Sequence, residues 1–263
     1  TGTCWPGAGN TGVPAGTVLS AYTGPCTITT PSTVINAKTI SCDLTIQAAG
    51  VTISNSQING TVSNEGSDAA FTVTDSTINA TPGATRQVTG IQSSNYTATR
   101  VNVTGGNRGM YCSSNCTILD SYVHGQKIQD NWHASAIRFE QDTHVTHNTI
   151  VCDAPVQPDP EGSCSASLTG YPDFAIIHDV YINHNLFPPT QYAAFCAYGG
   201  STNGKTYSGQ SYNVSFTNNI FTKGPTPDNQ YCALYGPISD FDQTRPGMVW
   251  QNNKWNDGEV ITP

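Results

Sequence analysis

A repeated eight-residue pattern constrains the fold of this chain more than any other feature. Each copy has an apolar third position and an apolar eighth position, and most copies have a polar pair at the fifth and sixth positions. The copies are VTISNSQI from residue 51, FTVTDSTI from 71, YTATRVNV from 96, CTILDSYV from 116, THVTHNTI from 143, VYINHNLF from 180, VSFTNNIF from 214 and MVWQNNKW from 248. Their starts lie 20, 25, 20, 27, 37, 34 and 34 residues apart, a spacing typical of solenoids and not of sandwiches.

The pattern within each copy indicates strands and a turn. Apolar residues alternate at the two-residue period of a strand, so they face one interior. The polar pair falls between two inward positions, where Asn, Asp and Ser favour a turn, and we expect stacked Asn amides to form ladders along the axis. A degenerate copy lies at 35–40, and further strands are predicted at 44–46, 90–92, 110–112, 136–139 and 174–177.

We therefore predict an all-β chain folded as a right-handed parallel β-helix, with one domain over residues 1–263. Coils occupy 31–263, and the segment 1–30, which is rich in Gly and Pro and lacks the repeat, is predicted to cap the first coil. Long insertions fall on the later coils, where they would wall a groove for an elongated ligand. These insertions are 124–135, 151–173, 188–195, 199–212, 222–230 and 236–247.

Nine cysteines in a chain with only 11% charged residues indicate an oxidising compartment and predict a secreted protein. The first residue is Thr1 and not Met, which we interpret as the start of a processed mature chain. We expect short loops to be closed by Cys4–Cys26, Cys112–Cys116 and Cys152–Cys164, with Cys196–Cys232 as a fourth pair and Cys42 buried and unpaired.

The charge balance argues against two classes of partner. Lys and Arg number 10 against 18 Asp and Glu, and the basic residues are scattered along the chain. A scattered distribution provides no electrostatic footprint for nucleic acid. No apolar run approaches the length needed to span a membrane. We expect a monomer that binds neither nucleic acid nor membrane.

The inward aliphatics, polar Asn turns and long later loops resemble the pectate-lyase-like superfamily of parallel β-helices. The strings CWPGAGNTGVPAGTVL, TITTPSTVINAKTISCDLTI, CTILDSYVHG, HNTIVCDAP, FCAYGG and YCALYGP are similar to secreted right-handed β-helix proteins of actinobacteria and fungi, many of which have no assigned activity. This resemblance covers nearly the whole chain and implies the fold. It also implies a polysaccharide ligand.

The six histidines all fall between residues 124 and 184, among other ionisable residues, and this concentration favours an enzyme. β-Elimination from a uronic-acid polymer needs a cation for the carboxylate, a base and an acid. Arg138 or Lys127 could be the cation, His133 or Lys127 the base, and His124 or Tyr198 the acid. The calcium cluster of pectate lyases is not recognisable, so we predict a metal-independent lyase and assign no metal site and no cofactor.

Glycoside hydrolysis is an alternative that needs two carboxylates at a suitable separation. Glu140 and Asp173 fall in consecutive predicted coils, with Asp130, Asp142 and Asp153 in reserve. The DxD and DD pairs that mark polygalacturonase-type β-helices are absent, which weakens this alternative.

A non-catalytic carbohydrate-binding β-helix is a second alternative, because aromatic side chains in the long loops would suffice to hold sugar rings. Trp132, Tyr171, Tyr198 and Tyr235 are the candidates for this stacking, and Asp130 is a candidate polar contact.

Structural interpretations compete with several of these functional ones. Arg138 and Glu140 could form a solvated ion pair on a sheet face, since both point outward if their neighbours point inward. His147 and His184 occupy equivalent turns and could stack, or bind a transition metal. Ice binding by a Thr array is disfavoured because no TxT row recurs in every coil.

Overall fold

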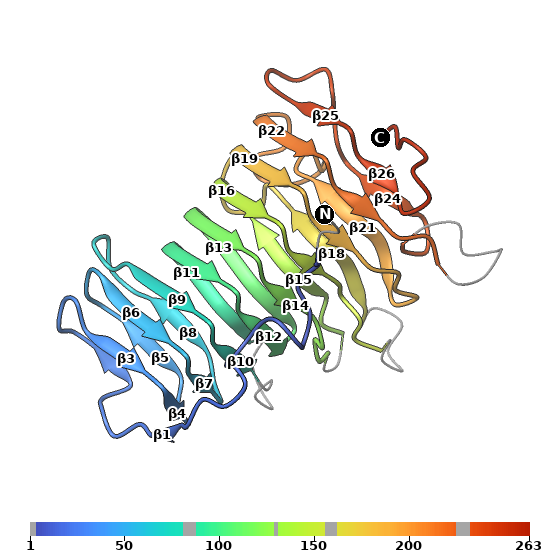
Figure 1. The fold of residues 1–263 in the computed structure, drawn as a ribbon. Helices are drawn as coiled ribbons and strands as arrows, with labels where there is room; N and C mark the ends of the chain where they lie inside the picture. Colours follow the sequence, from blue (N-terminus) through green and yellow to red (C-terminus); the bar gives the residue numbers. More distant parts are fainter. Residues whose placement is uncertain (1–3, 81–87, 129–130, 156–161, 225–231) are drawn as a thin grey trace.

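The computed structural model describes residues 4–80, 88–128, 131–155, 162–224 and 232–263. Within these ranges the chain forms strands, turns and loops, and its strands build long parallel sheets (Figure 1). No helix in the described ranges has the length and apolarity needed to cross a bilayer.

The strands stack in three rows. Row 1 is a sheet of 10 strands: β1 (Ser20–Ala21), β4 (Lys38–Ile40), β7 (Gln57–Ile58), β10 (Thr77–Ala80), β12 (Asn102–Gly105), β14 (Tyr122–Val123), β17 (Thr149–Ile150), β20 (Leu186–Phe187), β23 (Ile220–Phe221) and β26 (Lys254–Trp255). Row 2 contains β2 (Thr27–Ile28), β5 (Leu44–Ile46), β8 (Val62–Asn64), β11 (Thr89–Thr99), β13 (Arg108–Leu119), β15 (Ala134–Phe139), β18 (Cys164–Gly170), β21 (Ala193–Gly199) and β24 (Gly236–Ser239). Row 3 contains β3 (Val34–Asn36), β6 (Val51–Ser54), β9 (Phe71–Thr74), the second halves of β11 and β13, β16 (Gln141–Thr146), β19 (His178–Asn183), β22 (Tyr212–Thr217) and β25 (Val249–Gln251).

The chain visits the rows in a fixed order, passing through row 2, row 3 and row 1 before it begins the next repeat. The predicted third positions, such as Ile53 and Val145, are fully buried in row 3, and the eighth positions, such as Ile58 and Ile150, are fully buried in row 1. The degenerate first copy is also confirmed, because Ile35 and Ile40 are buried in β3 and β4. Such a cyclic path through parallel sheets is compatible with a parallel β-helix.

The polar pairs form the turns between row 3 and row 1, as predicted. The first residue of each pair has a positive φ, for example 49° at Asn55 and 52° at His147. The second residue is buried, and in the later repeats its amide forms a ladder. Nδ2 of Asn148 donates to Oδ1 of Asn185 at 3.0 Å, Asn185 donates to Asn219 at 3.0 Å, and Asn219 donates to Asn253 at 2.9 Å. Buried amides are stable only when hydrogen-bonded in this way.

The prediction of a strand at 174–177 is wrong. The row 2 strand of that repeat is β18, and residues 174–177 belong to the loop that follows it. The sequence of β18, CSASLTG, is rich in small residues with modest β-propensity, so the pattern did not distinguish it from a loop. Its inward residues Ala166 and Leu168 are nevertheless fully buried.

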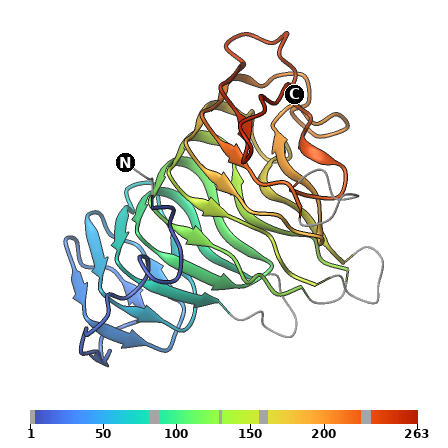
Figure 2. The same cartoon turned by 45° about the vertical axis from the view of Figure 1, so that its right-hand side comes forward.

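The boundary of the N-terminal segment differs from the predicted 1–30. Residues 20–28 already contribute β1 and β2 to the sheets. The preceding residues run along the outside of row 1 towards the middle of the molecule (Figures 1 and 2). The amide of Gly12 donates to the carbonyl of Arg100 at 2.9 Å, and Trp5 stacks on His147 and His184 with ring centroids 5.3 and 5.0 Å away.

Four disulfides are present, and three of them were predicted: Cys112–Cys116, Cys152–Cys164 and Cys196–Cys232. The predicted Cys4–Cys26 pair is wrong. Cys26 bonds to Cys42, with Cα atoms 6.3 Å apart, while Cys4 is a free, exposed thiol. The physical reason is the path of the N-terminal segment, because Trp5 holds Cys4 beside the later repeats whereas Cys26 and Cys42 flank adjacent strands of row 2. Four disulfides are typical of proteins from oxidising compartments.

The last repeat is covered by the C-terminal residues. The amide of Ile261 donates to the carbonyl of Asn253 at 3.0 Å, and Nε1 of Trp250 donates to the carbonyl of Ile261 at 2.7 Å. Val260 also makes an antiparallel bridge to Lys254. Ile261 is thereby buried against the aromatic end of the core, which protects the last strands from edge pairing.

Candidate functional site

A pocket of about 440 Å³ opens on the outer face of row 2, where the repeats of β13, β15, β18 and β21 meet their loops. Its floor is set by strand register, because Arg108 pairs with Ser135, Arg138 pairs with Thr169, and Thr169 pairs with Tyr198. We call this the row 2 pocket. It is lined by Arg108, His133, Ala134, Ser135, Arg138, Ser165, Thr169, Tyr171, Asp173, Tyr198, Thr202, Lys205 and Asp240.

Arg138 is the centre of the charged network in this pocket. Its Nη2 donates to Oε1 of Glu140 at 3.2 Å, to Oδ2 of Asp173 at 3.0 Å and to the carbonyl of Tyr171 at 3.3 Å. The guanidinium also lies 4.9 Å from the ring centroid of Phe174. Arg138 and Glu140 are only 7% and 2% exposed, so their ion pair is buried and not solvated as the structural interpretation expected. Removing one partner of such a buried pair is costly, because it leaves the other charge buried without compensation.

Glu140 lies beneath Arg138 and does not line the pocket. Burial raises the pKa of its carboxyl, while hydrogen bonds from Tyr111 and Arg138 and the charge of Arg138 oppose that rise. The residue anchors Arg138 through the contact of its Oε1 with Nη2 of Arg138.

Asp173 joins two cations at the pocket wall. Its Oδ2 accepts from Arg138, and its Oδ1 lies 3.1 Å from Nζ of Lys205. Lys205 also lies 5.3 Å from the ring centroid of Tyr171. Loops that follow β18 and β21 therefore meet here, which shows how the long insertions contribute side chains to one site.

Arg108 is the cation that the network leaves free. Among the described residues it has no carboxylate within ion-pair distance, and its Nε is buried with no acceptor. Its guanidinium lies 5.5 Å from the ring centroid of Tyr111. Burial, followed by the charge of Arg138, lowers the pKa of Arg108 to about 10. It stays cationic at neutral pH. The Nε of Arg138 has no acceptor either, so the two arginines differ in their carboxylate partners and not in this donor.

Tyr171 and Tyr198 form a pair of phenols in the pocket, with ring centroids 4.9 Å apart. Burial raises the pKa of both hydroxyl groups. Both phenols are therefore protonated at neutral pH and can donate a proton or a hydrogen bond. His133 lies at the exposed rim, where its Nδ1 is 3.5 Å from Oγ of Ser165.

Several predicted site residues lie elsewhere. His124 belongs to row 1, where it stacks on Tyr122 at 3.8 Å, hydrogen-bonds to Asn102, and has a pKa lowered by burial. Lys127 is exposed and does not line the pocket. Trp132 is partly buried and packs against the core. Tyr235 is 69% exposed and is not among the residues that line the pocket. Asp130 lies outside the described residues. The pocket thus unites His133, Arg138, Asp173, Tyr171 and Tyr198 from the predicted set.

Sequence reasoning missed Arg108, Lys205 and Asp240. Arg108 precedes the predicted strand at 110–112, so alignment of that strand with 136–139 would have placed it in the row of Ser135. Lys205 lies in an irregular loop, and Asp240 directly follows β24, a strand that the repeat pattern did not predict. The position of Lys205 depends on how that loop folds back over row 2.

The histidine pair in the row 3 turns stacks as the turn equivalence suggested, with His147 and His184 centroids 5.2 Å apart. Trp5 covers both rings, so the pair anchors the N-terminal segment. A different group of residues brings metal-ligand atoms together outside the row 2 pocket: Asp142, His178 and Asp179 each have one such atom within 4.8 Å of the others.

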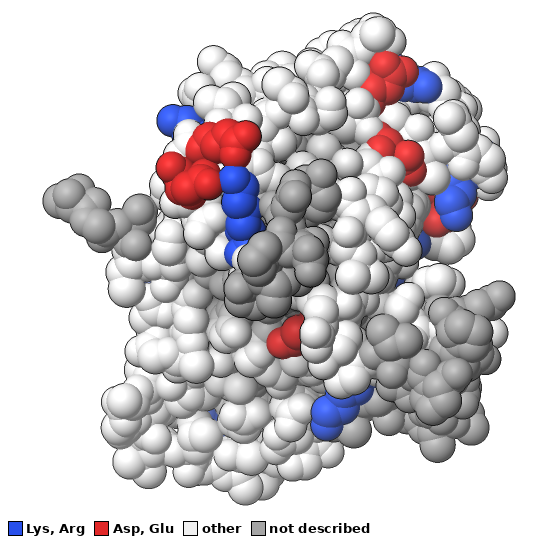
Figure 3. Space-filling model, turned by 90° about the vertical axis from the view of Figure 1, so that its right-hand side faces the viewer, with Lys and Arg blue, Asp and Glu red and all other residues white. Residues whose placement is uncertain are grey.

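On the face drawn in Figure 3, most of the surface is uncharged, and several basic groups in its upper half lie next to acidic ones.

Comparison with known proteins gave no family model, no curated protein and no solved structure that matches this chain significantly. Any assignment of function must therefore be argued from the chemistry of the pocket.

Proposed function

We propose that this protein is a secreted right-handed parallel β-helix that cleaves an anionic polysaccharide by metal-independent β-elimination. The cyclic order of the three parallel rows supports the β-helix, since parallel crossovers are almost always right-handed, and the four disulfides support secretion. The row 2 pocket supports the chemistry.

The observation that carries the proposal is a pocket that contains Arg108, an arginine without a carboxylate partner among the described residues, together with two protonated phenols. Elimination from a uronate requires neutralisation of its carboxylate, because negative charge develops there as the C5 proton leaves. Arg108 lines the pocket and has no carboxylate partner among the described residues, and a bidentate contact from arginine matches a carboxylate. Arg138 is held by Glu140 and Asp173 and supplies a second positive field.

The remaining steps need a base and an acid within reach of the sugar. His133 at the pocket rim would accept the C5 proton. Tyr198, paired with Tyr171, would donate its phenolic proton to the glycosidic oxygen as the C4–O bond breaks and the C4–C5 double bond forms. The products are an unsaturated uronate and a new reducing end, and the protein regains its protonation state by exchange with water.

The pocket favours elimination over hydrolysis. A glycosidase needs one protonated carboxylic acid at the scissile bond and a second carboxylate nearby. Glu140, whose pKa is raised, is shielded beneath Arg138. Each oxygen of Asp173 is already within 3.1 Å of a cation. Neither carboxyl is presented as a free acid or nucleophile.

The test is incubation of the purified protein with uronate-containing polymers and with neutral polysaccharides. The ultraviolet absorbance of unsaturated uronates and the formation of reducing ends are followed together. We expect both signals with a uronate polymer. We also expect Arg108→Ala and Tyr198→Phe to lose activity by about 100-fold or more, since general acid–base groups contribute about 10²–10⁴-fold.

Arg100→Ala is the matched control, because Arg100 is an exposed arginine paired with Asp75 away from the pocket, and it should retain full activity. Reducing ends without the ultraviolet signal would instead establish a hydrolase. Binding without either product would establish a carbohydrate-binding module and refute the catalytic proposal.

A further inference from the structure

The corner between row 2 and row 3 carries a column of Asn and Asp residues at equivalent positions in successive repeats. Strand register places Asn95, Asn115, Asp142, Asp179 and Asn213 next to one another in this order. All five have positive φ, for example 44° at Asp142 and 53° at Asp179. Asn and Asp tolerate this conformation better than other non-glycine residues. Backbone geometry therefore explains why Asn and Asp occupy the column.

The hydrogen bonding of the column is interrupted where the carboxylates meet. Nδ2 of Asn115 donates to Oδ1 of Asn95 at 2.8 Å, and Nδ2 of Asn213 donates to Oδ1 of Asp179 at 3.0 Å. Asp142 and Asp179 are adjacent, and an ionised carboxylate has no proton to donate. Among the described residues, the Asp142 carboxylate has neither a hydrogen-bond donor nor an ion-pair partner. Like charges opposite each other on neighbouring strands are destabilising, so this step of the column needs a positive group.

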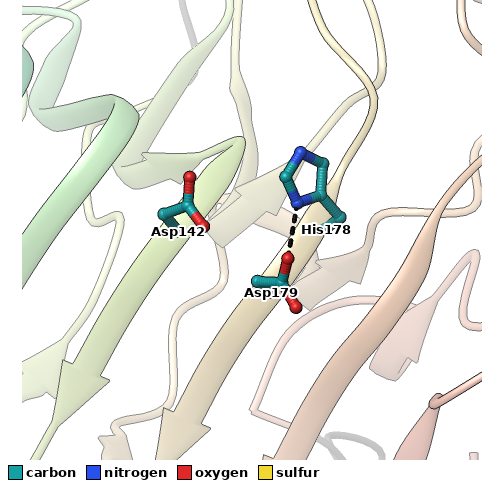
Figure 4. Close-up of side chains that lie close together, drawn as sticks. All are labelled: Asp142, His178 and Asp179. Atoms are coloured by element: carbon teal, nitrogen blue, oxygen red, sulfur yellow. Dashed lines mark hydrogen bonds and ion pairs between the residues drawn. The ribbon is translucent and has the colours of Figure 1, made fainter.

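An imidazole completes the group at this step. His178 precedes Asp179 at the start of β19, and its Nδ1 lies 2.8 Å from Oδ2 of Asp179 (Figure 4). The ring is held in place by Tyr212, which stacks on it with centroids 5.0 Å apart and an interplanar angle of 4°. One ligand atom from each of Asp142, His178 and Asp179 lies within 4.8 Å of the others. In Figure 4 the Asp142 carboxylate lies across from the other two side chains, on the neighbouring strand.

We propose that Asp142, His178 and Asp179 bind a first-row divalent cation, with Zn²⁺ as the preferred ion and water in the remaining position. One imidazole and two carboxylates form a mixed nitrogen and oxygen set, which suits zinc better than calcium or magnesium, because those ions take oxygen ligands only. Zinc bonds of about 2.0–2.2 Å place neighbouring ligand atoms about 3–3.5 Å apart. The ligand atoms in the structure lie within 4.8 Å of one another, and rotation of the exposed Asp142 side chain can bring them to the shorter separation that zinc requires.

The bound cation would join β16 to β19 at the corner beside the loop that carries Tyr171 and Asp173. It would neutralise the adjacent carboxylates and fix that loop at the edge of the row 2 pocket. The site lies outside the pocket lining, so it is separate from the elimination chemistry proposed above and can be tested without a substrate.

The test is calorimetric titration of the chelator-treated, full-length protein with zinc chloride. The background carries Cys4→Ser, since the exposed Cys4 thiol would itself bind zinc. We expect one zinc ion per chain, and we expect Asp142→Asn and His178→Gln each to weaken binding by at least about tenfold, as even an outer-shell partner of a ligand contributes that much. Thermal melting of each variant without metal verifies that it is folded.

Asp120→Asn is the matched control. Asp120 also pairs with a histidine on the outer surface, through Nδ1 of His147, but no third ligand group completes that pair among the described residues. Its zinc affinity should equal that of the Cys4→Ser background. The proposal is overturned if the background protein binds no zinc, if Asp142→Asn and His178→Gln bind as tightly as the background, or if Asp120→Asn abolishes the binding.

Discussion

The buried amide ladder allows a quantitative test of what holds the later repeats in register. The Asn185 side chain takes part in five hydrogen bonds. Its Oδ1 accepts from the backbone N and the Nδ2 of Asn148, and its Nδ2 donates to Oδ1 of Asn219 and to the carbonyls of Val145 and Asn183. The residue is fully buried, so water cannot replace the lost partners.

Asn185→Ala should lower the free energy of unfolding by about 3–5 kcal/mol, because each buried hydrogen bond contributes about 1 kcal/mol net and an orphaned donor costs about 1–3 kcal/mol. Asn185→Ser should recover part of this loss. In the earlier repeats a serine occupies the same position, and Oγ of Ser121 accepts from the backbone N of Val101 at 3.1 Å. Serine at 185 can therefore accept the hydrogen bond from the backbone N of Asn148, while the hydrogen bonds between the side-chain amides remain broken at this position.

The assay is urea denaturation followed by circular dichroism, with stability taken from the midpoint and slope. Asn59→Ala is the control, because Asn59 is exposed and accepts one surface hydrogen bond from Gln57 at 3.3 Å. It should change stability by less than about 0.5 kcal/mol. If Asn185→Ala were no more destabilising than Asn59→Ala, or if serine gave no recovery, the ladder would not hold the repeats as described.

Three further outcomes are expected. Replacing both Cys26 and Cys42 by Ser should lower the free energy of unfolding by about 3 kcal/mol, because their bond closes a loop of 16 residues. Cys4→Ser should leave the melting temperature unchanged. Equal effects of the two changes in a thermal melt would contradict the observed pairing. Burial raises the pKa of Glu140, so its contribution to stability is fully present below its unfolded-state pKa and is lost as pH rises through its folded-state pKa. Glu140→Gln should remove that part of the pH dependence in denaturant titrations, and an unchanged profile would show that the carboxyl is not perturbed. Trp5→Ala should release the N-terminal segment by removing two ring contacts worth about 0.5–1.5 kcal/mol each, so amide exchange of residues 5–13 should accelerate while that of the sheets stays constant.

The three rows could be predicted because their signal is periodic. Each repeat places apolar residues such as Ile118 and Val123 at the same offsets, and burial inside a stack of parallel strands demands that spacing. β18 consists largely of small residues, so its β-propensity is weak and its pairing with β15 and β21 in row 2 defines it. The path of the N-terminal segment could not be predicted either, because it depends on the contact of Trp5 with histidines far along the chain.

The candidate site also contains some residues that the local sequence predicts and others whose positions depend on contacts far along the chain. Arg138, Tyr171 and Asp173 were found because ionisable and aromatic residues concentrate in one stretch of sequence. The sequence did not reveal that Arg138 is buried and paired with two carboxylates while Arg108 has no carboxylate partner among the described residues. Part of that difference arises from the loop that follows β18, which brings Asp173 to Arg138, while Lys205 from the loop after β21 pairs with Asp173.

The amide ladder allows the loops to change in evolution while the stacked strands stay the same. Asn148, Asn185, Asn219 and Asn253 are 37, 34 and 34 residues apart in sequence, yet each amide makes the same hydrogen bond to the next. The pitch of the stack is set by these contacts and by the strands, and the number of residues between them does not enter. Loops over the row 2 pocket can therefore lengthen, shorten or change composition without shifting the floor beneath them, and a stack of this kind can acquire a new ligand by exchanging loops alone.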